Sequence, residues 1–105
     1  MNIKMANSIE IFQGNTKTIV CAVTGLASLT GYTATLTVKK EARDVGIPLI
    51  SVTGTIEALN ITFLTSATNN TLPAGKYVYE VSVTDGTNVY TIVQDVYEIL
   101  ESAKY

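Results

Sequence analysis

The sequence of 105 residues predicts an all-β domain, a sandwich of two packed antiparallel sheets. Residues that favour strands recur in short runs at regular spacing, and Gly, Asn, Asp and Pro mostly fall between the runs. Apolar and polar side chains alternate within the runs, as in TATLTVK, where Ala34, Leu36 and Val38 are separated by threonines. The length suits one domain over residues 1–105, and we expect its core to span about residues 9–99.

About seven strands are expected. The runs are Ser8–Gln13, Lys17–Thr24, Tyr32–Lys40, Leu49–Thr53, Ile56–Thr65, Lys76–Thr84 and Asn88–Leu100. Pro48 stands just before the fourth run, where a missing backbone donor does least harm to a sheet. Asp85-Gly86 is the strongest hairpin signal in the chain, and it predicts that the last two strands are antiparallel neighbours.

The same alternation predicts which side chains face the core. They are Ile19, Cys21 and Val23; Ala34, Leu36 and Val38; Leu59, Ile61 and Phe63; and Tyr77, Tyr79, Val81 and Val83. In the last run the parity changes between Ile92 and Val93. A β-bulge near Gln94 and Asp95 would account for this change, because one extra residue re-aims every side chain after it.

Tyr77 follows the turn residues Pro73 and Gly75 at the start of a strand. This arrangement is similar to the tyrosine corner of immunoglobulin-like sandwiches, in which the phenol hydroxyl bonds to upstream backbone. The alternative is a stacking platform for a sugar made of Tyr77, Tyr79 and Tyr90, which requires exposed rings. Alternation places Tyr77 and Tyr79 inside, so we expect the structural role.

Composition and charge argue against several classes of partner. The net charge is −2 and the basic residues are spread along the chain, whereas phosphate binding requires a concentrated basic face, so we expect no nucleic-acid partner. The one basic cluster, KKEARD (residues 39–44), is interrupted by Glu41 and Asp44, which is typical of a solvated loop. No apolar run has the length of a membrane span, and we expect no membrane partner.

The residues also offer little for catalysis. The chain has no histidine, which excludes Ser-His-Asp and Cys-His arrangements as well as histidine-based metal sites. Cys21 is the only cysteine, and it is expected to be a buried, inert thiol. Four carboxylates lie on expected strands without sharing one face, namely Glu57, Glu80, Asp95 and Glu98. No phosphate-binding glycine loop is present. We therefore expect no enzyme activity, no catalytic, cofactor-binding or metal-binding residues, and no cofactor.

Three segments in order carry a resemblance to a known family. They are IFQGNTKTIVCAV, then LTGYTATLTVKK followed by ISVTGTIEALNITFLTS, and then LPAGKYVYEVSVTDGTNVYTIVQDVYEI. Together, from about Ile9 to Ile99, they resemble the small immunoglobulin-like β-sandwich domains of tailed-bacteriophage structural proteins, such as the N-terminal domain of baseplate upper proteins. The resemblance implies a non-enzymatic virion component that docks on other virion structural proteins. It leaves head, neck and tail open.

We expect contacts through a sheet edge, an outward strand face or a terminal arm, with Asn2–Asn7 and Glu101–Tyr105 as candidate arms. A homo-oligomer is compatible with each of these. Since the N-terminus has no run of signal-peptide length, we expect the chain to be made in the host cytoplasm and to reside there or in the virion. Two alternatives stay open. One is a host-surface or carbohydrate-binding module that uses loops at one end of the sandwich, such as Gly25–Gly31 and Ser66–Ala74. The other is an Ig-like domain of a bacterial surface protein.

Overall fold

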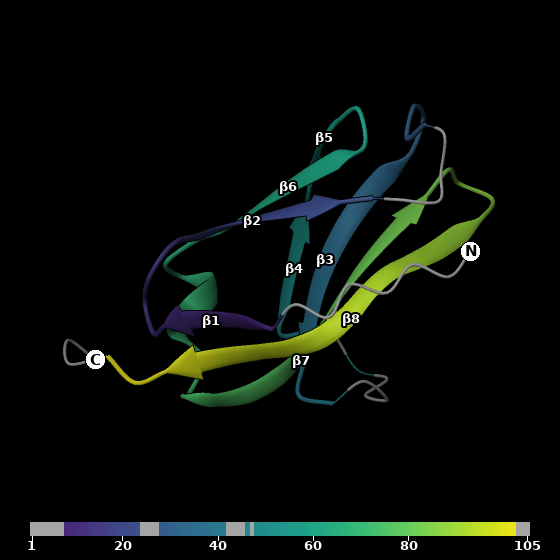
Figure 1. The fold of residues 1–105 in the computed structure, drawn as a ribbon. Coiled ribbons are helices and arrows are strands. Elements are labelled where there is room, and N and C mark those ends of the chain that lie inside the picture. Colours follow the sequence, from purple (N-terminus) through teal and green to yellow (C-terminus); the bar gives the residue numbers. More distant parts are fainter. Residues whose placement is uncertain (1–7, 24–27, 42–45, 47, 103–105) are drawn as a thin grey trace.

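Eight strands form two facing sheets in the computed structural model, which describes residues 8–23, 28–41, 46 and 48–102 (Figure 1). The larger sheet has the order β1 (Ile9–Phe12), β8 (Val89–Leu100), β7 (Gly75–Thr84), β3 (Thr33–Lys39) and β4 (Ile50–Thr53). The smaller sheet has the order β2 (Lys17–Ala22), β6 (Asn60–Thr65) and β5 (Thr55–Glu57). A short 3₁₀ helix, η1, spans Asn69–Thr71. In immunoglobulin terms, β8-β7-β3-β4 correspond to G-F-C-C′, with β1 added at the edge beside β8, and β2-β6-β5 correspond to B-E-D. The predicted Ig-like sandwich is therefore confirmed.

The fifth expected strand is in fact two strands. The run Ile56–Thr65 is broken by a tight turn at Ala58 and Leu59, which returns β6 antiparallel to β5 with Glu57 opposite Asn60. Ala58 has a positive φ of 54°, an uncommon conformation for a residue with a side chain. The sequence has no glycine at this turn, which is why the run looked continuous. The described residues therefore form eight strands, one more than the expected number of about seven.

One strand pair is parallel, which corrects the expectation of purely antiparallel sheets. β1 lies beside β8 and runs in the same direction, with Ile9 opposite Tyr97 and Phe12 opposite Leu100. The turn after β1 carries the chain across to the smaller sheet, where β2 pairs with β6 (Figure 1). β1 thus cannot form a hairpin with β2, and its partner is the last strand of the chain.

The core lies between the two sheets and consists of the side chains that alternation predicted. Eleven of the thirteen predicted residues are buried, and Ile19 and Leu59 are half-buried against them. Buried residues outside that prediction are Ile9, Ile11, Leu29, Ile50, Ile92, Val93, Tyr97 and Ile99, with Thr65 and Asn70 as buried polar residues. Nearly the whole length of the described chain contributes to one apolar interior.

A β-bulge in β8 produces the parity change that the sequence indicated. Val81 on β7 faces Val93, and the next residue, Ser82, faces Thr91, so Ile92 is the extra residue. Ile92 and Val93 are consequently both buried. The bulge lies two residues before the predicted position at Gln94. The reason is that the change in side-chain direction occurs directly between Ile92 and Val93.

The predicted hairpin and tyrosine corner are both present. β7 and β8 are antiparallel neighbours, and the carboxylate of Asp85 accepts hydrogen bonds from the backbone N–H groups of Thr87 and Asn88 at 2.9 and 2.7 Å. These bonds hold the pKa of Asp85 below its usual value. The hydroxyl of Tyr77 donates a 2.6 Å hydrogen bond to the carbonyl oxygen of Pro73. Tyr77 therefore has the structural role expected from its position.

Candidate functional site

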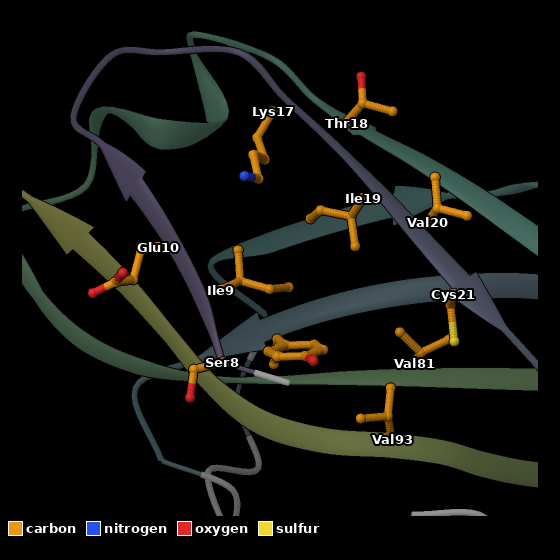
Figure 2. Close-up of a pocket in the computed structure, with 11 residues that line it drawn as sticks. Ser8, Ile9, Glu10, Lys17, Thr18, Ile19, Val20, Cys21, Val81 and Val93 are labelled. Carbon is orange, nitrogen blue, oxygen red and sulfur yellow. The ribbon is translucent and has the colours of Figure 1, made fainter. Parts of the chain in front are cut away.

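A cavity of about 230 Å³ lies between β1, at the edge of the larger sheet, and β2, at the edge of the smaller sheet (Figure 2). Its lining includes six core-facing or half-buried side chains, Ile9, Ile19, Cys21, Tyr79, Val81 and Val93, and five side chains nearer solvent, Ser8, Glu10, Lys17, Thr18 and Val20. Its inner wall thus belongs to the sandwich core. It is smaller than the 300–1,000 Å³ typical of small-molecule sites, and one or two apolar side chains would suit it better than a substrate.

The titratable groups of the inner wall are held in their neutral forms. Burial raises the pKa of the Cys21 thiol above 9.0. Burial, followed by the nearby charge of Asp95 and by Cys21, raises the pKa of Tyr79 to about 12. A thiol without thiolate character is a poor nucleophile, so the expectation that Cys21 is buried and unreactive agrees with its surroundings. Among the described residues, no group of three or more His, Cys, Asp or Glu could hold a metal ion.

The outer edge of β2 forms the second part of the site. Within the described part of the chain, β2 pairs only with β6. The N–H of Val23 donates to Leu59 on the β6 side at 2.8 Å. Since backbone groups alternate along an antiparallel strand, the N–H and C=O groups of Thr18, Val20 and Ala22 point the other way. We call this side the β2 edge.

The four carboxylates considered for catalysis do not converge. Glu57 lies on the smaller sheet, while the other three lie on the larger sheet. Glu80 and Glu98 share its outer face, but Glu98 faces Lys76, four residues before Glu80, which is a separation of roughly 13 Å along the strand. A glycosidase pair is about 5–9.5 Å apart. Glu80 instead accepts a hydrogen bond from the side chain of Gln94 at 3.1 Å.

The carboxylate of Asp95 is used in local hydrogen bonds. Its carboxylate accepts the N–H of Val96 at 2.7 Å and the hydroxyl of Ser8 at 3.5 Å. It faces Tyr79 across the β7–β8 pair, on the core side of the sheet. Asp95 is therefore on the opposite side of the larger sheet from Glu80.

The tyrosine platform is contradicted by burial. Tyr77 and Tyr79 are 5% and 3% exposed, so neither ring can stack on a sugar at the surface. Tyr90 is half-buried and its ring contacts that of Tyr32, with centroids 6.4 Å apart. The Tyr77 ring has another partner, because the ammonium of Lys40 lies 4.9 Å from its centroid. Of the KKEARD cluster, residues 42–44 lie outside the described residues.

The described parts of the two loops of the carbohydrate-binding alternative lie at opposite ends of the larger sheet, which corrects that expectation. Residues 66–74 lead into the start of β7, whereas residues 28–31 lead into the start of β3, which the register places beside the end of β7. The loop of residues 66–74 is also fixed to the rest of the domain by burial and hydrogen bonding. Asn70 is fully buried within it, and the Gln13 side chain donates to the carbonyl of Leu72 at 2.9 Å. Residues 66–74 and 28–31 therefore do not form one binding surface, and residues 24–27 lie outside the described residues.

The candidate arms fall mostly outside the described residues as well. Only Glu101 and Ser102 of the C-terminal arm are described, and residues 1–7 and 103–105 are not. None of the helices in the described residues could cross a membrane, since none has the required length and apolarity.

No protein-family model and no curated protein sequence matches the chain. Its fold is similar to part of a Bacteroides vulgatus protein that carries a provisional assignment as a glycoside hydrolase, with a TM-score of 0.53 and 12% identity over 91% of this chain. The chain spans only 17% of that protein. It is also similar to the extracellular domains of the voltage-gated sodium channel beta4 subunit, described as parallel homodimers with a role in cell-cell adhesion. There the TM-score is 0.50 and the identity 13%, over 97% of both chains.

A Bacillus anthracis protein of uncharacterised function gives a TM-score of 0.46 at 12% identity, over 92% of this chain and 85% of that one. At these identities the comparisons show the fold alone. The chain is an all-β, Ig-like sandwich, and the activities of the similar proteins do not transfer to it.

Proposed function

We propose that the chain is a non-enzymatic structural protein of a tailed-bacteriophage virion, an Ig-like module that docks on other head, neck or tail components. The resemblance of its three segments to sandwich domains of phage structural proteins supports this function. The observation that carries it is the absence, among the described residues, of a pocket with converging charged groups. The buried side-chain polar atoms of these residues all have hydrogen-bond partners, so we assign the contacts to the sheet edges and arms.

The partners in this proposal are other virion proteins. The net charge of −2 offers no basic face for nucleic acid. Edge strands carry unpaired backbone groups that pair with an extended segment of another protein, and terminal arms provide such segments. The proposal places the chain in the virion after synthesis in the host cytoplasm.

Truncation of each arm tests the function. Both Met1–Asn7 and Glu101–Tyr105 lie outside the core that the sequence predicts, about residues 9–99. We expect both truncated forms to keep the circular dichroism spectrum and melting curve of the full chain, and at least one to be incorporated poorly into particles, as measured by gel analysis of purified virions. The matched control replaces Met1–Asn7 by a Gly/Ser segment of equal length, which keeps the reach but removes the side chains.

Two outcomes would contradict parts of the proposal. Full incorporation of both truncated forms would reject the arms as docking elements and leave the sheet edges. Absence of the intact chain from purified particles, together with glycan binding by the isolated domain, would favour the host-surface or carbohydrate-binding alternative.

A further inference from the structure

The β2 edge has fewer of the features that keep edges from pairing than the other sheet edges, since its only charged residue is Lys17 at its start. The edge strand β1 carries Glu10, the edge strand β5 has three residues including Glu57, and the edge strand β4 has four residues and follows Pro48 closely. Short length, charge and proline are the usual protections of an edge. β2 has six residues, and the stretch from Thr18 to Val23, TIVCAV, contains no charge, proline or glycine.

The side chains on the outer face of β2 are also apolar at the edge. Val20 is 62% exposed, and Leu64 on the neighbouring strand β6 is 57% exposed. Leu64 faces Thr18 in the β2–β6 register, so it lies diagonally beside Val20 on the same face. The uncharged stretch Thr18–Val23, the small apolar strip on its outer face and the cavity on its inner face are features of one half of an interface.

We propose that the β2 edge pairs antiparallel with the β2 edge of a second copy of this chain, about a two-fold axis at Val20. The two three-stranded sheets then form one sheet of six strands. The strand is self-complementary in this register: Val20 faces the partner's Val20, and Thr18 faces the partner's Ala22. Lys17 faces the partner's Val23, so the two lysines lie far apart and no like charges oppose each other. Such a contact is isologous and closes as a dimer.

The backbone and the cavity both support a second copy as the occupant. Thr18, Val20 and Ala22 are the residues whose N–H and C=O groups point to the β2 edge, and they are the residues that face each other across the proposed axis. The core-facing residues of the added strand, the partner's Ile19 and the partner's Cys21, come to the mouth of a cavity that Ile9 and Val93 line. This inference does not depend on the proposed virion function.

Cysteine cross-linking tests the register. In a hydrogen-bonded antiparallel pair the Cα atoms are about 5.5 Å apart, within the disulfide range of about 4.4–6.8 Å. We expect Val20→Cys to give a disulfide-linked dimer on a non-reducing gel after mild oxidation. The control is Val89→Cys, which is 68% exposed at the β7–β8 hairpin and distant from β2 in the chain, and which should remain largely monomeric. Equal cross-linking of the two variants would overturn the proposal.

Sedimentation of the full chain tests the association itself. We expect a monomer–dimer equilibrium whose dissociation constant rises about tenfold or more in Val20→Lys, because two ammonium groups then meet at the axis. Val89→Lys, which adds the same charge elsewhere, should leave the constant unchanged, and circular dichroism should show both variants folded. A chain that is monomeric at every concentration would overturn the proposal. So would one that dimerises only after removal of residues 1–7, since that segment would then be the occupant.

Discussion

The hydroxyl of Tyr97 on β8 donates a 2.6 Å hydrogen bond to the side-chain oxygen of Asn70 in η1, and neither residue has any exposed surface. The amide nitrogen of Asn70 donates to the hydroxyl of Thr65 and to the carbonyls of Asn15 and Ser66, at 2.7–3.2 Å. One asparagine thus joins η1 to strands of both sheets and to the turn after β1. Its hydrogen bonds satisfy polar groups that would be costly to bury alone.

Removing this amide should destabilise the domain strongly. Asn70→Ala removes the buried partner of both the Tyr97 hydroxyl and the Thr65 hydroxyl, and each unsatisfied buried group costs about 1–3 kcal/mol. We expect a loss of more than about 2 kcal/mol in the free energy of unfolding, measured by urea denaturation. The neighbouring variant Asn69→Ala is the control, because its hydrogen bonds to Ser66 are exposed. Similar losses in both variants would show that burial of the network is unimportant.

The tyrosine corner predicts a smaller effect. Tyr77→Phe removes only the hydroxyl that donates to Pro73, so we expect a loss of roughly 0.5–1.5 kcal/mol, the net value of a typical hydrogen bond. Tyr32→Phe is the matched control, since the structure gives the Tyr32 hydroxyl no hydrogen bond to the described residues. If Tyr77→Phe were as stable as the unchanged protein in chemical denaturation, the hydrogen bond from Tyr77 to Pro73 would not contribute to the stability of the fold.

The ring of Phe63 fills the centre of the sandwich and is fully buried. Phe63→Ala should therefore cost about 3–5 kcal/mol in the free energy of unfolding, from lost burial and from the cavity left behind. A difference below about 1 kcal/mol, which is typical of surface substitutions, would contradict the buried position.

Gly54 provides a test of how closely the same ring is packed. A Cβ at this position would lie 2.6 Å from Cε1 of Phe63 and 2.7 Å from Cγ2 of Ile61, so Gly54→Ala should destabilise the domain. Phe63→Leu should relieve part of that clash. We expect the double variant to lose less stability than the sum of the two single losses, by about 0.5 kcal/mol or more in a double-mutant cycle. Simple additivity would mean that the two residues do not contact.

The conformational stability of the domain should fall at alkaline pH. Burial raises the pKa of Tyr77 and Tyr97, and burial together with Asp95 and Cys21 raises that of Tyr79 to about 12. The folded state thus keeps protons that the unfolded state loses above about pH 10, so this contribution is complete below pH 10 and is lost as pH rises through 12. The denaturation midpoint of the protein should fall as the pH rises from about 10 to 12. The midpoint of the Tyr79→Phe variant should fall less steeply over the same range. An equal slope in both proteins would contradict the role of Tyr79.

Alternation predicted the core well because each strand has one buried face, which fixes the parity of Leu36, Phe63 and Tyr79 alike. Features that depend on a single backbone conformation were harder to predict. The Ala58 turn has no glycine or proline to mark it, and the burial of Asn70 depends on partners up to 55 residues away in sequence. Asparagine in a loop usually indicates a turn, so its role in joining the sheets had no local signal.

The candidate site was predicted only in part. Edge contacts were expected, but sequence gives no strand order, and only the order places β2 at an edge beside a cavity. The same limit applied to residues 28–31 and 66–74, whose positions at opposite ends follow from the direction of β3 relative to β7. Cys21 was correctly expected to be buried, because its apolar neighbours alternate with it.

The parallel pairing of β1 with β8 bears on how the chain is completed during synthesis. Ile9 pairs with Tyr97, 88 positions later, so β1 has no partner in its sheet until the last strand has left the ribosome. At about 5–20 residues per second, this interval lasts roughly 4–18 seconds. Throughout it the apolar side chains of Ile9 and Ile11 lack the strand that buries them, and chaperone binding to a nascent chain would be expected to concentrate there.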